Sequence, residues 1–256
     1  MLQQQSYVPP PSLFLALTEA HRAVIEAIVL GVTRRTLDSI APQGDGHAVM
    51  ILPGFLAGDG YNGALKRFLG GINYAVHGWG LGRNLGPRNG VQEKLEKQLI
   101  RLVDRYDAPV SLVGHSLGGI FARELARAHP DKVRQVISLG SPFGEGRMTA
   151  SIPARLFTAL NPPDELTIDQ NLLAQAPPVP TTAIYSKGDG IVNWQTTFQQ
   201  SGHAQTQSIR VRGSHCGMTL NPSIWLLLAE CLAMQPGQWQ PFRARSWRAL
   251  VYPAAN

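Results

Sequence analysis

The stretch Val110-Ser111-Leu112-Val113-Gly114-His115-Ser116-Leu117-Gly118-Gly119 decides how this chain is interpreted. Its first four residues form an apolar run typical of a buried β-strand, and the residues from Leu117 onward have the apolar spacing of a helix. Between them Ser116 occupies the turn of a G-x-S-x-G pattern, where glycines let strand, turn and helix pack closely. The pentapeptide alone is a weak signal, so its position between a strand and a helix carries the interpretation.

Short β-rich runs alternate with helical stretches on both sides of this turn. The predicted strands are 48–52, 72–76, 110–113, 133–139, 181–185 and 207–211, and the predicted crossover helices are 91–106, 117–128 and 223–234. This alternation predicts an α/β fold, with a mostly parallel sheet of about six strands flanked by helices.

The composition is that of a folded globular chain. Hydrophobic residues make up 44% of the 256 residues and charged residues 16%, which excludes disorder, collagen and coiled coil. The two cysteines have neither a disulfide-framework nor a zinc spacing, so no metal is expected. The formal charge of +6 could suit an anionic partner, but no nucleic-acid motif accompanies it.

The length predicts one domain over 1–256, with a helical N-terminal segment 1–44, a cap insertion 143–180 and a basic tail 235–256. Apolar residues recur at helical spacing in the first segment: Leu13, Leu17, Val24, Ile25 and Ile28. We favour a helix that packs on the core, and a helix lying on a bilayer stays open. Because the start has no basic n-region, we expect a cytoplasmic protein, with a membrane-peripheral location as the variant.

A serine in such a turn needs a base and an acid before it can act as a nucleophile. Ser116 is therefore the candidate nucleophile. Asp189 follows the predicted strand 181–185, and His215 follows the strand that ends at residue 211. The alternative acids Asp164 and Asp169 fall in a proline-broken stretch and do not follow a strand.

At these residues the sequence resembles the α/β-hydrolase superfamily, most closely its bacterial lipases and esterases. The resemblance covers 47–234 and implies the chain order nucleophile, acid, base, which Ser116, Asp189 and His215 satisfy. The implied oxyanion hole consists of the backbone N–H groups of Phe55 and Leu117. Pro53 stands where many lipases have histidine, so the backbone donor is kept and the histidine contact is not.

The expected substrate pocket lies under the cap. Leu156, Phe157 and Leu160 would line it from one helical face, and Trp79 would form a wall at the end of a strand. The predicted function is hydrolysis of carboxylic esters, without a cofactor, on a small-molecule or lipid substrate. Thioesterase, lactonase and amidase chemistry on the same triad stay open, as does a non-catalytic scaffold that binds an anionic lipid surface. The oligomeric state is not predicted.

Overall fold

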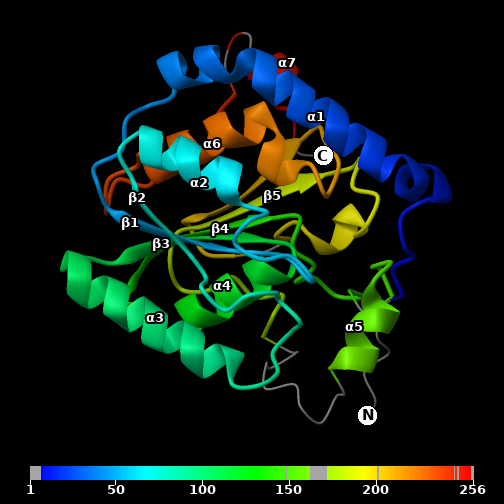
Figure 1. Ribbon diagram of the computed structural model, residues 1–256, viewed down its shortest axis with the longest axis horizontal. Coiled ribbons are helices and arrows are strands. Elements are labelled where there is room, and N and C mark those ends of the chain that lie inside the picture. Colours follow the sequence, from blue (N-terminus) through cyan, green and yellow to red (C-terminus); the bar gives the residue numbers. More distant parts are fainter. Residues whose placement is uncertain are drawn as a thin grey trace.

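Six parallel strands form the centre of the computed structural model, which describes residues 7–147, 149–161, 172–200, 202–244, 246 and 248–254 (Figure 1). Their order is β2-β1-β3-β4-β5-β6, and every neighbouring pair is parallel. The strands are β1 (Ala48–Leu52), β2 (Ala75–Gly78), β3 (Val110–His115), β4 (Val133–Leu139), β5 (Thr181–Ser186) and β6 (Thr206–Val211). The predicted α/β class and the six-stranded sheet are confirmed.

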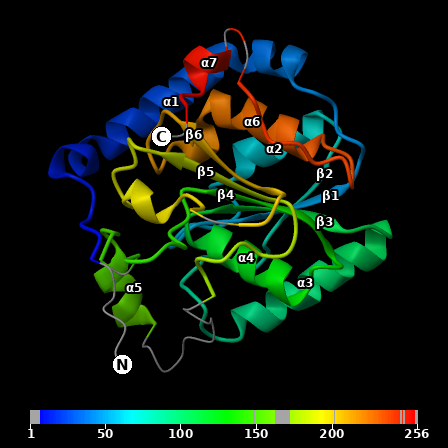
Figure 2. The ribbon, with the colours of Figure 1, turned by 180° about the vertical axis from the view of Figure 1, so that it is seen from behind.

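Helices cover both faces of the sheet, as Figures 1 and 2 show from opposite sides. On one face α2 and α6 pack against the strands, and α1 lies across α6; on the other face lie α3 and α4. The described helices are α1 (Leu13–Ile40), α2 (Gly63–Gly71), α3 (Val91–Tyr106), α4 (Leu117–Ala128), α5 (Ala154–Leu160), α6 (Pro222–Leu232) and the short α7 (Arg248–Val251). Central strands β1 and β3 are buried throughout, because helices cover them on both sides.

The second strand is displaced from its predicted position. The apolar run 72–76 predicts a strand there, but β2 begins at Ala75. Ile72 caps α2, a helix that the sequence reading missed, and Asn73 has a positive φ of 69°. The amide of Tyr74 bonds to the Leu69 carbonyl. The chain is therefore still leaving the helix where the hydrophobic pattern indicates a strand.

The N-terminal helix packs on the core, but the prediction of which face it buries is wrong. The apolar residues that predict its buried face point to solvent: Leu13 is 80% exposed, Leu17 77% and Ile28 61%. The face that meets the rest of the molecule carries buried Leu30 and Leu37 together with charged side chains. Of the predicted cap 143–180, the structure shows α5, and residues 162–171 lie outside the described residues.

Candidate active site

Ser116 occupies a strained turn between β3 and α4. Its φ of 51° and ψ of −122° are unfavourable for an L-residue and belong neither to the strand β3 nor to the helix α4. A Cβ at Gly114 would lie 2.3 Å from the Gly119 Cα, and one at Gly118 would lie 2.2 Å from the Leu52 carbonyl oxygen. The glycines of the motif therefore permit a backbone packing that larger residues would prevent.

This packing predicts the effect of Gly114→Ala on stability. The added methyl meets backbone that cannot move aside, so we expect the free energy of unfolding to fall by about 1 to 3 kcal/mol. Gly31→Ala is the matched control, because Gly31 lies in α1 with no atom within 4 Å of its Cβ position. Removing a helical glycine there should stabilise the protein by about 0.5 to 1 kcal/mol. Urea unfolding of both variants measures the difference, and equal effects would contradict the packing.

Asp189 and His215 form a buried pair at the carboxyl edge of the sheet. Asp189 follows β5 and His215 follows β6, and the two are 3% and 4% exposed. The Nδ1 of His215 lies 2.6 Å from Asp189 Oδ2, while Asp189 Oδ1 accepts the amides of Ile191 at 2.9 Å and Val192 at 2.7 Å. This bonding places the imidazole proton on Nδ1 and leaves Nε2 as the acceptor.

His115 connects the His215 loop to the turn that carries Ser116. The His115 ring donates from Nε2 to the His215 carbonyl at 3.0 Å, and the two ring centroids lie 4.9 Å apart. Burial and the neighbouring His215 lower the pKa of His115 to about 3, so this ring stays neutral. Burial opposes the charged form of His215, but the Asp189 carboxylate outweighs it and raises the pKa of His215 above its usual value.

The loop after β1 lies directly against Ser116. A Cβ at Gly54 would be 3.1 Å from both the Ser116 Cβ and the His115 Nδ1, so a larger residue there would press on these two side chains. In the described part of the chain the Phe55 amide has no protein acceptor, and Leu117 is the first residue of α4, where amides lack intrahelical partners. Buried Asn84, which the sequence reading missed, holds this loop: its Nδ2 donates to Pro53 O at 2.7 Å.

An apolar cavity of about 90 Å³ opens at the turn. Its lining includes Ser116, Leu117, Phe55 and Phe157, and the two phenylalanine rings meet edge to face at 5.6 Å. The predicted pocket residue Phe157 is thus brought to Ser116.

The other three predicted pocket residues do not line this cavity. Trp79 is 1% exposed and lies in the core, where its indole N–H donates to the Gly82 carbonyl at 2.8 Å. Leu156 is 47% exposed on the outer side of α5, and Leu160 does not reach the cavity. A short amphipathic helix can present one face only, and Phe157 occupies it.

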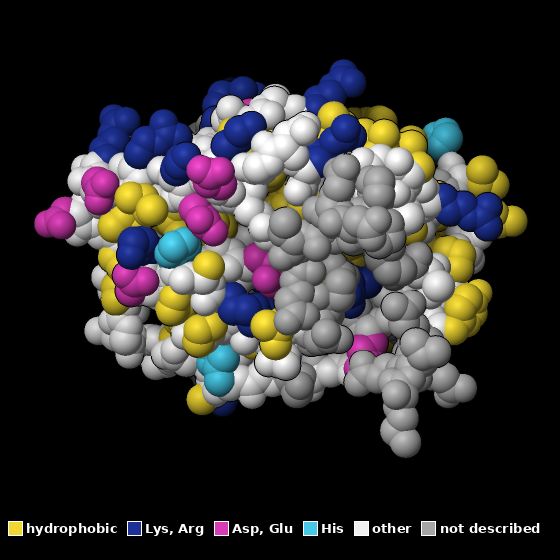
Figure 3. Space-filling view, turned by 90° about the horizontal axis from the view of Figure 1, so that it is seen from below, with side chains coloured by type: hydrophobic (Ala, Val, Ile, Leu, Met, Phe, Trp, Pro, Cys, Tyr) yellow, Lys and Arg dark blue, Asp and Glu magenta, His cyan; other side chains and the backbone are white. Residues whose placement is uncertain are grey.

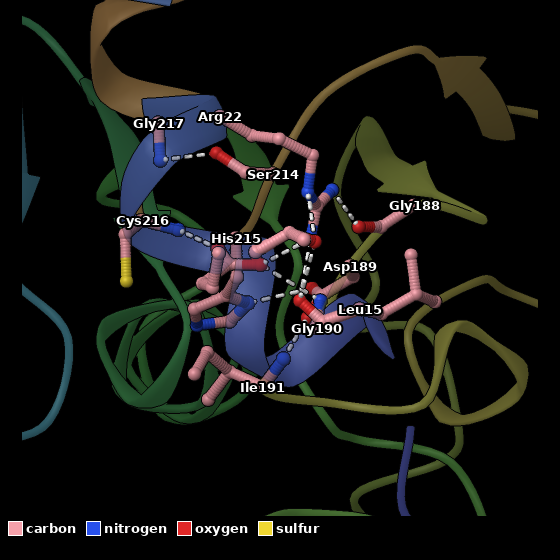
Figure 4. A network of polar contacts seen from close by, with 12 residues as sticks. Leu15, Arg22, Gly188, Asp189, Gly190, Ile191, Ser214, His215, Cys216 and Gly217 are labelled. Atoms are coloured by element: carbon pink, nitrogen blue, oxygen red, sulfur yellow. Dashed lines mark hydrogen bonds and ion pairs between the residues drawn. The ribbon is translucent and has the colours of Figure 1, made fainter. Parts of the chain in front are cut away.

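Charged side chains of α1 reach both loops of the Asp189–His215 pair (Figure 4). Glu19 accepts backbone amides from Gly190 and Cys216, and Glu26 accepts from Ser214. Neither acid was among the predicted site residues. Their spacing could have indicated a shared partner, because residues 19, 22 and 26 lie on one face of a helix.

Metal ligands do not gather in the described part of the chain. Within 7–147, 149–161, 172–200, 202–244, 246 and 248–254, no three His, Cys, Asp or Glu side chains are grouped to hold a metal ion. Asp164 and Asp169 lie outside the described residues. Burial raises the pKa of the Cys216 thiol to about 11, so this neighbour of His215 is protonated at neutral pH.

Comparison with known proteins agrees with the observed fold. The family model of the alpha/beta hydrolase fold matches residues 105–177, which contain the turn at Ser116. Among curated proteins no sequence matches the chain. Lipase B of Aspergillus fumigatus is 17% identical at a TM-score of 0.59, over 80% of this chain and 58% of that one, so the chain spans under two thirds of that lipase.

Two further solved structures align over most of their own length. A structure from LipS and LipT, two metagenome-derived lipolytic enzymes, is 15% identical at a TM-score of 0.55, over 76% of this chain and 95% of that one. Alpha/beta hydrolase domain-containing protein 10 from mouse is 20% identical at 0.52, over 73% and 88%. The predicted resemblance to α/β-hydrolases is confirmed as a likeness of fold, and its bacterial qualifier stays a prediction.

Proposed function

We propose that this chain, which has the α/β-hydrolase fold, is a serine hydrolase that cleaves carboxylic esters through Ser116, His215 and Asp189. The observation that carries the proposal is the buried Asp189–His215 bond of 2.6 Å, at the same sheet edge as the strained Ser116. Packing alone needs neither a strained serine nor a buried hydrogen bond between a carboxylate and an imidazole, and together they are the parts of a nucleophile and its base.

The geometry supports a two-step mechanism. His215 Nε2 takes the proton of the Ser116 hydroxyl as the serine oxygen attacks the ester carbonyl, while Asp189 stabilises the imidazolium that forms. The amides of Phe55 and Leu117 bind the developing oxyanion. His215 then protonates the leaving alcohol, and a water activated by the same imidazole releases the acid from Ser116.

The cavity favours an ester with an apolar acyl group. Its lining is mostly aliphatic and aromatic, and Phe157 and Phe55 narrow it beside Ser116. Thioesters, lactones and amides would pass through the same tetrahedral intermediate, and they remain alternative substrates. A series of p-nitrophenyl esters of increasing chain length separates these classes by acyl preference.

Covalent labelling tests the proposal without knowledge of the substrate. A fluorophosphonate probe should modify Ser116 at neutral pH, because the reagent reacts with serines that a neighbouring base activates. Intact-mass measurement and peptide mapping give the stoichiometry and the position. Absence of labelling on folded protein would overturn the enzyme proposal in favour of a non-catalytic scaffold.

We also propose that the outer face of α1 contacts an anionic lipid surface. Between Leu13 and Val32 the exposed side chains are almost all apolar, none is acidic, and His21 alone among them can carry charge. The acids Glu19 and Glu26 point inward. Figure 3 shows the molecule from below, on the side of the sheet away from α1. On this face basic, acidic and hydrophobic side chains are interspersed.

A cationic hollow beside this face supports an anionic partner. Its volume is about 310 Å³, it adjoins Ile25, and four basic side chains line it with one acidic one: Arg22, Lys187, Arg210, Arg212 and Glu26. No helix among the described residues is long and apolar enough to cross a membrane. A single domain in the cytoplasm, peripheral to a membrane, is the arrangement we propose.

The lipid contact predicts the behaviour of the double variant Val24→Ser, Ile28→Ser. Losing two exposed aliphatic groups should weaken binding to vesicles of phosphatidylcholine and phosphatidylglycerol about tenfold or more. Ile100→Ser is the control, because Ile100 is an exposed aliphatic residue of α3, and this variant should bind as the wild type does. Sedimentation with vesicles measures binding. Unchanged binding, or a dimer that the double variant dissociates, would contradict a lipid partner.

A further inference from the structure

We propose that Glu19 of α1 is a positioning residue for the Asp189–His215 pair, a buried carboxylate that fixes the acid loop and the base loop relative to each other. The proposal rests on the serine hydrolase function given above. It makes the N-terminal helix a part of the site, although α1 precedes every strand of the sheet.

Glu19 bonds to the residue that follows each member of the pair. It is 4% exposed. Its Oε1 accepts the amide of Cys216 at 2.7 Å and its Oε2 accepts the amide of Gly190 at 3.0 Å. One carboxylate therefore connects the backbone immediately after His215 to the backbone immediately after Asp189.

Two more side chains of the same helix face complete the contact. Arg22 pairs with Glu19 Oε2 at 2.8 Å and donates to the Gly188 carbonyl, on the other side of Asp189. Glu26 accepts both the amide and the hydroxyl of Ser214 at 2.7 Å. Each loop is thus bound by α1 on both sides of its functional residue.

Three loop glycines leave room for these carboxylates. A Cβ at Gly190 would lie 2.6 Å from Glu19 Oε2, while Cβ atoms at Gly213 and Gly217 would lie 2.7 Å and 1.4 Å from Glu26 oxygens. Any larger residue at these positions would displace the helix or its acids. The two loops are therefore shaped around the α1 side chains, and a chance surface contact would not require this.

The charge of Glu19 also acts on His215. Charged or titratable groups surround the imidazole from several elements. Asp189 follows β5, His115 is on β3, and α1 contributes Glu19, Arg22 and Glu26. Cys216 follows His215, and the Tyr61 ring stacks on His115 while its hydroxyl donates to the Cys216 carbonyl. Burial lowers the pKa of His215, whereas the carboxylates of Asp189 and then Glu19 raise it. Since the base acts in its neutral form, removing the Glu19 charge should extend activity to lower pH.

Glu19→Gln tests the proposal by two readouts. In the Ser116→Ala background, the His215 imidazole followed by NMR should titrate at lower pH than it does with Glu19 present. In the active protein kcat/KM at neutral pH should fall about tenfold to a hundredfold, since the amide cannot accept both backbone bonds as a carboxylate does. Asp38→Asn, an exposed α1 acid paired with Arg34, is the control and should change neither readout.

Two results would overturn the role of Glu19. One is a folded Glu19→Gln protein whose His215 titration and kcat/KM both equal those of the wild type. If that variant does not fold, Glu19→Asp replaces it, because this change keeps the charge and withdraws it from both amides. It should titrate nearly as the wild type with lower kcat/KM, and unchanged kcat/KM would be the second overturning result.

The NMR titration also separates this proposal from the proposed function. If the wild type neither hydrolyses an ester nor reacts with the fluorophosphonate, but His215 responds to Glu19→Gln as expected, the serine hydrolase proposal fails and the link between Glu19 and the pair stands. If hydrolysis is found and Glu19→Gln changes neither the His215 titration nor kcat/KM, only the role of Glu19 fails.

Discussion

Ser116→Ala should lower kcat for ester hydrolysis about 10⁶-fold, to the level left by substrate binding and the oxyanion donors. The reason is geometric. The strained φ of 51° presents the Ser116 side chain to the cavity, and no other hydroxyl occupies that turn. Alanine removes the nucleophile without adding volume, so the fold should be retained. Initial rates on a p-nitrophenyl ester, with circular dichroism of the same samples, measure the loss.

A serine outside the site gives the control for this change. Ser39 is exposed near the end of α1, and Ser39→Ala should keep the wild-type rate. Cys216→Ala tests a second candidate, because the Cys216 thiol adjoins His215 and is also a nucleophilic group. Activity that survives Ser116→Ala and disappears with Cys216→Ala would reject Ser116 in favour of the thiol.

Local signals were enough to predict the turn at Ser116 and most of the sheet. The glycines around Ser116 are required by contacts within a few residues of the turn, so the requirement is visible in the sequence. The predicted bounds of α3 and α4 agree with the structure for the same reason, since each helix carries its own apolar face and end signals. Burial of central parallel strands on both faces likewise leaves a continuous apolar run.

The orientation of α1 could not be read from its periodicity. A helical repeat shows that one face is apolar, but it does not show whether that face meets the core or the solvent. The decisive partners of Glu19 and Glu26 are amides more than 150 residues further along the chain. Backbone amides leave no mark in a sequence, and so no pattern in the sequence indicated a role for the two acids.

Three of the four predicted pocket residues lie away from the cavity for a related reason. Trp79 follows a strand at the expected sheet edge, yet the Gly82 carbonyl provides a partner for its indole N–H inside the core. Asn84 was missed because an amide in a loop has no spacing that marks it, although it bonds to the Pro53 carbonyl beside Gly54. Long-range loop contacts decide which side chains line a cavity, and single-sequence patterns do not contain them.

Asp189→Asn should lower kcat about 10⁴-fold while leaving the protein folded. An asparagine at this position can direct its amide N–H₂ toward His215 Nδ1, which moves the imidazole proton to Nε2 and removes the acceptor that Ser116 needs. The Ile191 and Val192 amides keep an oxygen acceptor in this arrangement, so the loop should hold its shape.

The same substitution at other acids shows whether the loss is specific to Asp189. Asp104→Asn should retain the wild-type kcat. Asp104 is exposed on α3, which covers the face of the sheet opposite α1. Asp164→Asn tests one of the two alternative acids in the sequence, Asp164 and Asp169. Because an imidazole with its proton on Nε2 cannot deprotonate Ser116, the Asp189 variant should also react slowly with a fluorophosphonate. A larger loss from Asp164→Asn, or normal labelling of Asp189→Asn, would assign the orienting acid elsewhere.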